Sequence, residues 1–500
     1  MFIAGLDVGS TNVKITVMNR NGEIAHYGYR DYPSNRNVEA HEINVVDIWE
    51  AAKILLKDAM AAVPQLSAVG ITSFGESMAI LDADGEVLFP AMMYTDPRGT
   101  EEVELLRERL GDDFICATAG TNAYPMYSLP KLMWIKKHRP DVYEKTQHIC
   151  LISDYLIFKL TGERKIDYAL AARTMGLDIR KKEWSPEIFE AAGICKSLFS
   201  QPVPAGTYAG RILPDVAAEL GISNELKIVV SCHDQAAAAV GANVMRAGIA
   251  TDGCGTLQCM TPVFSILPEG RTLQDNQYAI VPFLREDTYC TYAFSFVGGS
   301  LTKWFVSHFA TAYEAEAAET NESIYQVLEQ KMTDEPTGIL VLPHFAGAGT
   351  PYMDTQSKGA FVGMTLHHTP ADMFKAIMEG IAYEMRINME RLKNSGVQIN
   401  ELHATGGCAK SKLWLQLKAD ILGVPITRMS TDEAGTIGGI MLTGVATGVY
   451  ADLDEAAKML VQPLDTYYPR ADMQAKYDKH YQRYSRLYDA IRPLAEDSEE

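Results

Sequence analysis

The chain has 500 residues, more than one hydrophobic core usually supports, so we expect two large domains. Its 45 basic and 64 acidic residues give a net charge of −19, which argues against a nucleic-acid or anionic-membrane partner. No apolar run reaches membrane-spanning length, Asp7 interrupts any signal peptide, and the eight cysteines form no C-x-x-C pair. We therefore expect a cytoplasmic protein without a zinc site or a disulfide framework.

The first thirty residues predict two strands around a tight polar turn. Residues 2–6 are apolar, residues 13–18 resume the strand pattern, and Asn21-Gly22 is typical of a hairpin turn. The segment between the strands begins with a carboxylate and contains one glycine and three small polar residues. It matches neither the P-loop nor the G-x-G-x-x-G dinucleotide pattern.

This turn contains groups that suit a phosphate and a magnesium ion. Gly9 lets a ligand approach the backbone, and the hydroxyls of Ser10 and Thr11 can donate to phosphate oxygens. Lys14 supplies a positive charge. Asp7 is the candidate metal ligand, because Mg²⁺ prefers one or two carboxylates together with phosphate oxygens and water. The alternative, equally consistent with this stretch alone, is a hairpin with an aspartate in its turn.

Helix and strand patterns follow through the first half of the chain. The predicted elements are helices over 47–63, 101–110, 131–138 and 153–161, a strand over 69–73 and a hairpin over 78–88. A later apolar strand, 226–231, leads through His233 to Asp234 and a helix that begins with four alanines. We expect a structural role for His233. Asp234 is either a helix N-cap or a reactive carboxylate at the carboxyl edge of a strand.

The pattern of the N-terminus returns half a chain later. Residues 249–253 lead to Cys254-Gly255-Thr256 and then to a second apolar stretch. This echo predicts a second domain built like the first, with boundaries at 1–246 and 247–500. No long linker separates the halves, so we expect a close, hinged pair.

The second half predicts further alternating elements. They are a hairpin-like region over 288–296, a helix opening at 298–300, strands over 339–343 and 401–405, helices over 370–394 and 413–422, a small-residue helix from 433, and one amphipathic helix over 467–491.

The order of these motifs resembles the FGGY family of carbohydrate kinases, which includes glycerol, xylulose, fuculose and gluconate kinases. The motifs are Asp-x-Gly-Ser-Thr from Asp7, Asp234-Gln235, Gly255-Thr256, and Gly-Gly-x-x-x-Ser ending at Ser411. The resemblance extends from Ile3 to about Tyr450. It implies an α/β fold with two actin-like (ribonuclease H-like) ATPase domains around a central cleft.

The resemblance also implies roles for individual residues. Asp234 would be the catalytic base, Asp7 would hold Mg²⁺, and Gly9, Ser10, Thr11 and Lys14 would meet the phosphates of ATP. The residues of the second half that would bind the nucleotide are Gly255, Thr256, Gly298, Gly299, Gly406, Gly407, Lys410 and Ser411. Lys303 could join them or be a solvated helix charge.

The substrate side carries fewer signals. Glu76 lies where glycerol kinases place a hydroxyl-binding glutamate, but Gly75 replaces their arginine, and the Gln-Met-His of xylulose kinases is absent. These two departures put both glycerol and xylulose in doubt as the substrate. The remaining candidate substrate residues are Tyr94, Asp96, Tyr127 and Asp234. Asp96 could instead pair with Arg98.

We expect ATP-dependent phosphorylation of a hydroxyl on a small open-chain sugar or polyol, most simply a ketose, with Asp234 as base. One alternative is an actin- or Hsp70-like ATPase, which would need a peptide-binding domain. Another is a sugar-sensing regulator on the same scaffold, which would need a DNA-binding extension. Relatives in the family suggest a homodimer.

Overall fold

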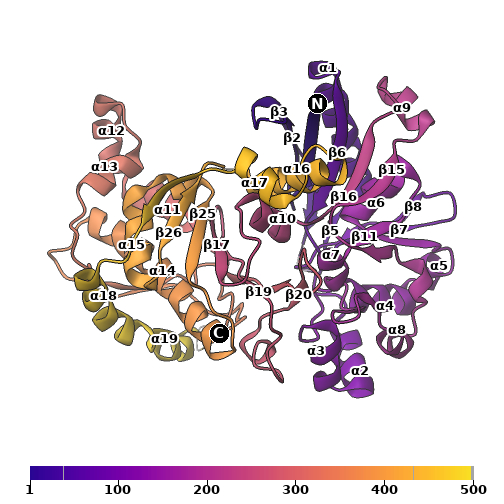
Figure 1. The fold of residues 1–500 in the computed structure, drawn as a ribbon. Helices are drawn as coiled ribbons and strands as arrows, with labels where there is room; N and C mark the ends of the chain where they lie inside the picture. Colours follow the sequence, from indigo (N-terminus) through magenta and orange to yellow (C-terminus); the bar gives the residue numbers. More distant parts are fainter. Residues whose placement is uncertain (38, 432, 497–500) are drawn as a thin grey trace.

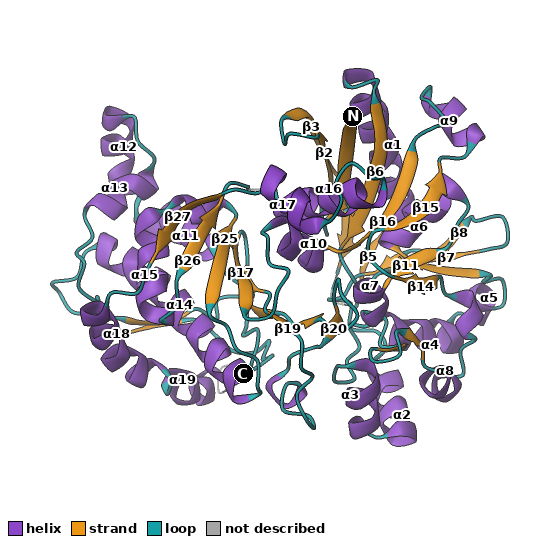
Figure 2. Cartoon of the chain, viewed as in Figure 1, coloured by secondary structure: helices purple, strands orange, loops and turns teal. Residues whose placement is uncertain are grey.

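The computed structural model describes residues 1–37, 39–431 and 433–496, and two β-sheets form its centre, one in each half of the chain (Figure 1, Figure 2). The end of the predicted second domain, 497–500, lies outside the described residues. The first sheet contains β3 (Ile24–Asp31), β2 (Asn12–Asn19), β1 (Phe2–Val8), β6 (Leu66–Ser73), β16 (Lys227–His233) and β15 (Thr207–Arg211). The second contains β22 (Ala293–Ser295), β18 (Gln258–Met260), β17 (Ile249–Cys254), β25 (Glu401–Thr405), β26 (Ile426–Met429) and β27 (Pro463–Tyr467).

The two sheets share one strand order and one pattern of directions. Taken in the orders given above, each sheet has two antiparallel pairings, then two parallel pairings, then one antiparallel pairing. The expected repetition of the first fold in the second half is therefore confirmed. Within the described residues, no helix is long and apolar enough to cross a membrane.

The side chains of β1 alternate between the two faces of the first sheet. Ala4, Leu6 and Val8 pack in the core formed with α1 (Val45–Ala62) and α6 (Ile152–Thr161). The opposite face carries Gly5 and Asp7, which lie against α16 (Ala434–Ala446). Asp7 is therefore on the face that the second half of the chain covers.

Glycines allow α16 to contact the first sheet at backbone distance. A side-chain carbon at Gly5 would lie 2.1 Å from the carbonyl oxygen of Thr436, and one at Gly438 would lie 1.9 Å from that of Ala237 in α10 (Asp234–Gly241). Farther along, Tyr450 donates a hydrogen bond to the carbonyl oxygen of Arg20 at 2.9 Å. A segment of the second half thus packs on the first sheet, as α16 beside β2 and β6 shows (Figure 1). The boundary at residue 246 stays a prediction.

Most of the other expected elements are present. The confirmed helices are α1, α2 (Thr100–Leu110), α4 (Ser128–His138), α6, α11 (Gly299–Phe309), α14 (Pro370–Asn394), α15 (Lys412–Leu422) and α16, and the confirmed smaller strands are β7 (Met78–Leu81), β8 (Val87–Phe89) and β23 (Leu340–Leu342).

Two expectations were wrong. The segment predicted as one helix over 467–491 instead ends β27 and then forms α18 (Ala471–Tyr484) and α19 (Leu487–Glu496). Tyr467 pairs with Ile426 at the edge of the second sheet, and Pro469 disfavours helix in the residue before it. The region over 288–296 is no hairpin either. Its first strand, β21 (Tyr289–Cys290), pairs with β19 (Val263–Phe264) and β20 (Val281–Pro282), whereas β22 joins the second sheet.

Candidate active site

Asp7 lies near the carboxyl end of β1, against the start of α16. A side-chain carbon at Gly435 would lie 2.8 Å from Oδ2 of Asp7, so the helix can approach this closely only because Gly435 has none. The Oδ1 atom of Asp7 is buried and has no hydrogen-bond partner in the described part of the chain. Burial raises the pKa of Asp7 to about 6, although the positive charge of Lys14 opposes this effect. The carboxylate is therefore well placed to accept a cation or its water ligands.

The second sheet carries an aspartate at the equivalent position, but a lysine neutralises it. Asp7 is paired with Thr72, and Asp252 is paired with Ala404, in both cases one step before the last pair of the parallel ladder. Lys418 on α15 lies 2.8 Å from both carboxylate oxygens of Asp252, and these side chains are only 2% and 1% exposed. Of the two equivalent carboxylates, only Asp7 is thus available to a ligand.

The phosphate-binding candidates of the first half surround the β1–β2 turn. The N–H of Gly9 donates to the carbonyl oxygen of Asn12 at 2.8 Å, which leaves Ser10 and Thr11 at the tip. Lys14 is opposite Asp7 in the pairing, but its Nζ donates to Glu433 at 3.1 Å. Lys14 would have to leave Glu433 to meet a phosphate, and that role remains a prediction.

Asp234 is the first residue of α10 and directly follows β16, as expected. Its side chain is 24% exposed, whereas that of the preceding His233 is 7% exposed. Burial, the charge of Asp7 and the charge of Glu76 raise the pKa of Asp234 to about 8. A carboxyl group with a raised pKa beside other acids is typical of a functional site.

Glu76 is held by a buried guanidinium that the sequence did not point to. The backbone of Glu76 has a left-handed φ of 68°, and the Glu76 carboxylate accepts a hydrogen bond from Nε of Arg173 at 2.6 Å. Arg173 follows α7 (Tyr168–Ala172). A side-chain carbon at Gly75 would lie only 3.0 Å from Cγ of Arg173. Gly75 therefore makes room for Arg173, and the carboxylate–guanidinium pair is assembled from two distant segments.

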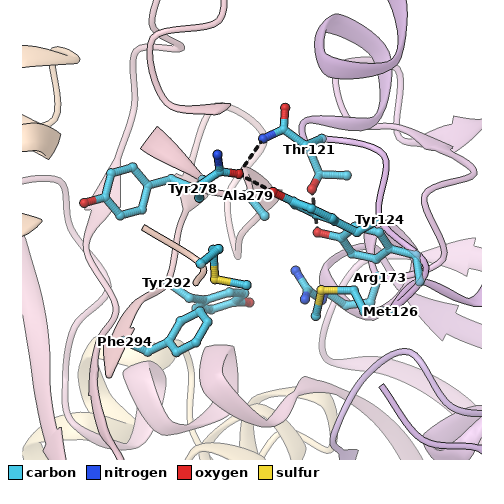
Figure 3. A pocket seen from close by; sticks show the side chains of 12 residues that line it. Thr121, Tyr124, Met126, Arg173, Tyr278, Ala279, Tyr292 and Phe294 are labelled. Atoms are coloured by element: carbon cyan, nitrogen blue, oxygen red, sulfur yellow. Dashed lines mark hydrogen bonds between the residues drawn. The ribbon is translucent and has the colours of Figure 1, made fainter. Parts of the chain in front are cut away.

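Arg173 also forms a wall of a small pocket between the two halves (Figure 3). Its guanidinium lies 5.0 Å from the ring centre of Tyr127 and 5.7 Å from that of Tyr292. The hydroxyl of Tyr124 donates to Gln277, so both halves contribute to the lining. The cavity measures about 40 Å³, enough for about three water molecules or a few hydroxyl-bearing carbons.

The other predicted substrate residues divide into two groups. Burial raises the pKa of Tyr94, and the charges of Glu76 and Asp234 raise it further, so its hydroxyl lies near both acids. Asp96, in contrast, accepts hydrogen bonds from Nε and Nη2 of Arg98 and from the backbone of His41, and its side chain is 0% exposed. The expected alternative, a pairing of Asp96 with Arg98, is present, and the substrate role of Asp96 stays a prediction.

A larger cavity of about 710 Å³ lies in the second half. Of the predicted nucleotide residues, those that line it are Gly255, Thr256, Gly299, Gly407, Lys410 and Ser411, and Lys303 lies beside them. Its remaining walls include the rings of Tyr325, Phe374 and Trp414. The cavity thus combines backbone donors and hydroxyls with flat apolar surfaces, a combination that suits a nucleotide.

Gly298 and Gly406 do not line this cavity but shape its loops. A side-chain carbon at Gly298 would lie 2.7 Å from the carbonyl carbon of Leu257, and one at Gly406 would lie 2.8 Å from the carbonyl oxygen of Cys254. Gly406 also has a φ of 89°, which disfavours other residues. Gly406 thus lets the loop after β25 contact the end of β17, and Gly298 lets the segment between β22 and α11 contact the turn after β17, both at backbone distance.

The described residues fit a magnesium ion held mainly by its substrate. Among them, no group of three or more His, Cys, Asp or Glu side chains could hold a metal ion. Mg²⁺ usually keeps several waters and needs only one or two carboxylates plus phosphate oxygens, so Asp7 with its unpartnered Oδ1 is sufficient protein ligation.

The sequence matches a known family along most of its length. Residues 2–241 match the N-terminal domain, and residues 267–447 the C-terminal domain, of the FGGY family of carbohydrate kinases. The chain belongs to this family. It is therefore a carbohydrate kinase, a phosphotransferase, and the fold class of two actin-like ATPase domains is confirmed.

Several curated relatives cover nearly the whole chain. A xylulose kinase from Bacillus subtilis (strain 168) is 27% identical, with 99% of this chain and 98% of the relative aligned. Glycerol kinase 2 from Saccharolobus solfataricus is 30% identical over 91% of this chain and 90% of its own. The crystal structure of ligand-bound xylulose kinase from Lactobacillus acidophilus superposes with a TM-score of 0.87 at 24% identity and covers 98% of both chains. A gluconate kinase structure from the same organism has the same values, and both likenesses establish the fold.

Sequence reasoning missed Arg173, Tyr292 and the aromatic walls of the larger cavity. Arg173 lies in a mixed segment without a clear periodicity, and Tyr292 reaches the site only because the two halves meet. The one local signal was Gly75, whose missing side chain leaves room for a large group from elsewhere.

Proposed function

We propose that this FGGY kinase transfers the γ-phosphoryl group of ATP to a hydroxyl of a small open-chain sugar or polyol, with Asp234 as general base. The observation that carries the proposal is the position of Asp234, at the end of β16 and close enough to Asp7 and Glu76 for their charges to raise its pKa to about 8. A base of this pKa is strong when ionised and can take the hydroxyl proton as the oxygen attacks the phosphorus.

The phosphate side would be organised by Asp7 and the turn around Gly9. A Mg²⁺ bound there would neutralise charge on the transferring group. The N–H groups and hydroxyls of Ser10, Thr11 and Thr256 would orient the phosphates from both halves. The cavity in the second half would receive the nucleoside, with the rings of Tyr325, Phe374 or Trp414 against its base.

Charge around the substrate site favours a neutral substrate. With Asp7 assigned to Mg²⁺, Glu76 and the ionised base Asp234 put two carboxylates on the substrate side, opposite the one guanidinium of Arg173. An aldonate would add a further negative charge, whereas a ketose or polyol offers hydroxyls to Glu76, Arg173 and Tyr94. The relatives named xylulose and glycerol kinase support this class. Gly75 and the missing Gln-Met-His leave the individual sugar open, and the homodimer stays a prediction.

The test is a coupled ATPase screen across pentuloses, hexuloses, polyols and aldonates, on the wild type and on Asp234→Asn. We expect turnover that depends on an added neutral sugar or polyol. Asp234→Asn should fold and bind ATP but lose at least about 10³-fold in kcat, because the base is gone. Asp58→Asn, on the exposed side of α1, is the matched control and should behave as wild type. ATP turnover without a sugar would instead favour an actin- or Hsp70-like ATPase. Sugar binding without any turnover would favour a sensor, and near-normal turnover of Asp234→Asn would remove the base assignment.

A further inference from the structure

His233 lies between the proposed base and a tyrosine from the other half of the chain. Its Nε2 atom is 3.3 Å from Oδ1 of Asp234, and its Nδ1 atom is 2.9 Å from the hydroxyl oxygen of Tyr292. His233 ends β16 in the first sheet, whereas Tyr292 immediately precedes β22 at the edge of the second sheet. Both residues are buried: counted over the whole residue, His233 is 5% exposed and Tyr292 is 7% exposed.

The charge state of His233 determines the direction of its hydrogen bond with Tyr292 and which ring nitrogen faces Asp234. Burial, helped by the nearby guanidinium of Arg173, lowers the pKa of His233 well below its usual value, so the ring is neutral and carries one N–H. When Asp234 is ionised, as the base must be, its carboxylate only accepts, so the tautomer that suits it has the N–H on Nε2, the ring nitrogen 3.3 Å from Oδ1. Nδ1 is then the acceptor, and the hydroxyl of Tyr292 donates to it. Burial also raises the pKa of Tyr292 well above its usual value, which keeps this proton in place.

The imidazole ring has little freedom to turn away. The ring of Tyr292 lies 5.3 Å from it, centre to centre. A side-chain carbon at Gly75 would lie 3.2 Å from Nε2, so the ring packs directly on that backbone. The backbone N–H of His233 donates to the buried carboxylate of Asp167 at 3.3 Å. The ring that contacts Asp234 is therefore fixed from several sides, and Tyr292 fixes it from the second half.

We propose that His233 and Tyr292 are positioning residues, which orient the carboxylate of Asp234 for proton transfer and make this orientation depend on contact between the two halves. The inference rests on the proposed role of Asp234 as base. Neither residue needs to touch the substrate for this effect. Their removal should therefore lower kcat and leave the substrate KM nearly unchanged.

The first test uses Tyr292→Phe, which removes one oxygen and keeps the ring against His233 and Arg173. We expect kcat to fall about 10- to 100-fold, as small displacements of a reacting group do, with the substrate KM within about twofold of wild type. Tyr450→Phe is the matched control. It removes another buried tyrosine hydroxyl that joins the two halves, outside the site, and should keep wild-type kinetics. An unchanged kcat in Tyr292→Phe, or a rise in KM alone, would overturn the proposal.

The second test asks whether Tyr292 acts through His233. His233→Leu should lower kcat at least as much as Tyr292→Phe does, and adding Tyr292→Phe to it should cost less than about twofold more. If the kcat losses of the two single variants multiply fully in the double variant, Tyr292 does not act through His233, which would contradict the proposal. His233→Gln, whose amide can still donate to Asp234, should recover part of the kcat lost in His233→Leu. If His233→Leu does not fold, Tyr292→Phe and its control Tyr450→Phe still test the positioning role of Tyr292. Activity retained in Asp234→Asn would remove the base assignment on which this inference rests, whereas an unchanged kcat in Tyr292→Phe removes the inference alone, so the two failures stay distinct.

Discussion

Replacing Lys418 with methionine tests whether the second sheet depends on the ion pair that neutralises Asp252. Both side chains are at most 2% exposed, and Nζ also donates to Gln258 at 3.0 Å. Burial is the largest single effect and lowers the pKa of Lys418, but the charge and hydrogen bond of Asp252, together with the two neighbouring cysteines, outweigh it and raise the lysine pKa. Removing one partner of such a pair leaves an uncompensated buried carboxylate, which costs about 3–5 kcal/mol.

Native-state hydrogen exchange is the suitable assay, because a chain of two large units need not unfold in one step. At about 1.4 kcal/mol per factor of ten, Lys418→Met should speed exchange of amides in β17, β25 and α15 about 10²- to 10⁴-fold. Amides of β1 and β6 in the first sheet should change far less.

Two variants make the experiment decisive. Asp252→Asn combined with Lys418→Met removes both charges and should recover most of the protection. Lys137→Met breaks a surface pair with Glu101, in which the two side chains are 54% and 79% exposed, and should leave exchange unchanged. Slow exchange of β17 in Lys418→Met, or a double variant as unprotected as the single one, would refute the reasoning.

Three further predictions concern the active site. Because burial and the charges of Asp7 and Glu76 raise the pKa of Asp234 to about 8, the ionised base is scarce below that pH, and kcat/KM should rise with pH up to about 8; a flat profile between pH 6 and 8 would contradict this. Asp7→Asn should raise the Mg²⁺ concentration for half-maximal rate at least about tenfold, measured at fixed ATP, and an unchanged requirement would rule out Asp7 as the metal ligand. Arg173→Lys keeps the charge but loses the planar fork that pairs with Glu76, so the substrate KM should rise about 10- to 100-fold while ATP affinity, measured by calorimetry, stays constant.

Local patterns in the sequence were sufficient for most helices and strands and for the family. The helix over 370–394 was predicted to its ends, and the features that begin it are local: Thr369 caps it with Asp372, and Pro370 occupies its first turn. Asp7, Asp234 and the glycine loop at Gly406 were found for the same reason, since Asp7 lies near the end of a strand with a clear apolar pattern and the other two directly follow one.

Contacts between distant segments could not be predicted in this way. The segment predicted as one terminal helix begins as a strand because Tyr467 pairs with Ile426, and Lys14 is paired with Glu433, far away in the chain. The guanidinium beside Glu76 comes from residue 173, and the hydroxyl beside His233 comes from residue 292. Sequence determined which groups end each strand, because strand periodicity and turn chemistry are properties of neighbouring residues. Tertiary structure alone decided which of these groups are neutralised, which are oriented and which remain available, because burial and the nearest charge depend on segments that only folding brings together.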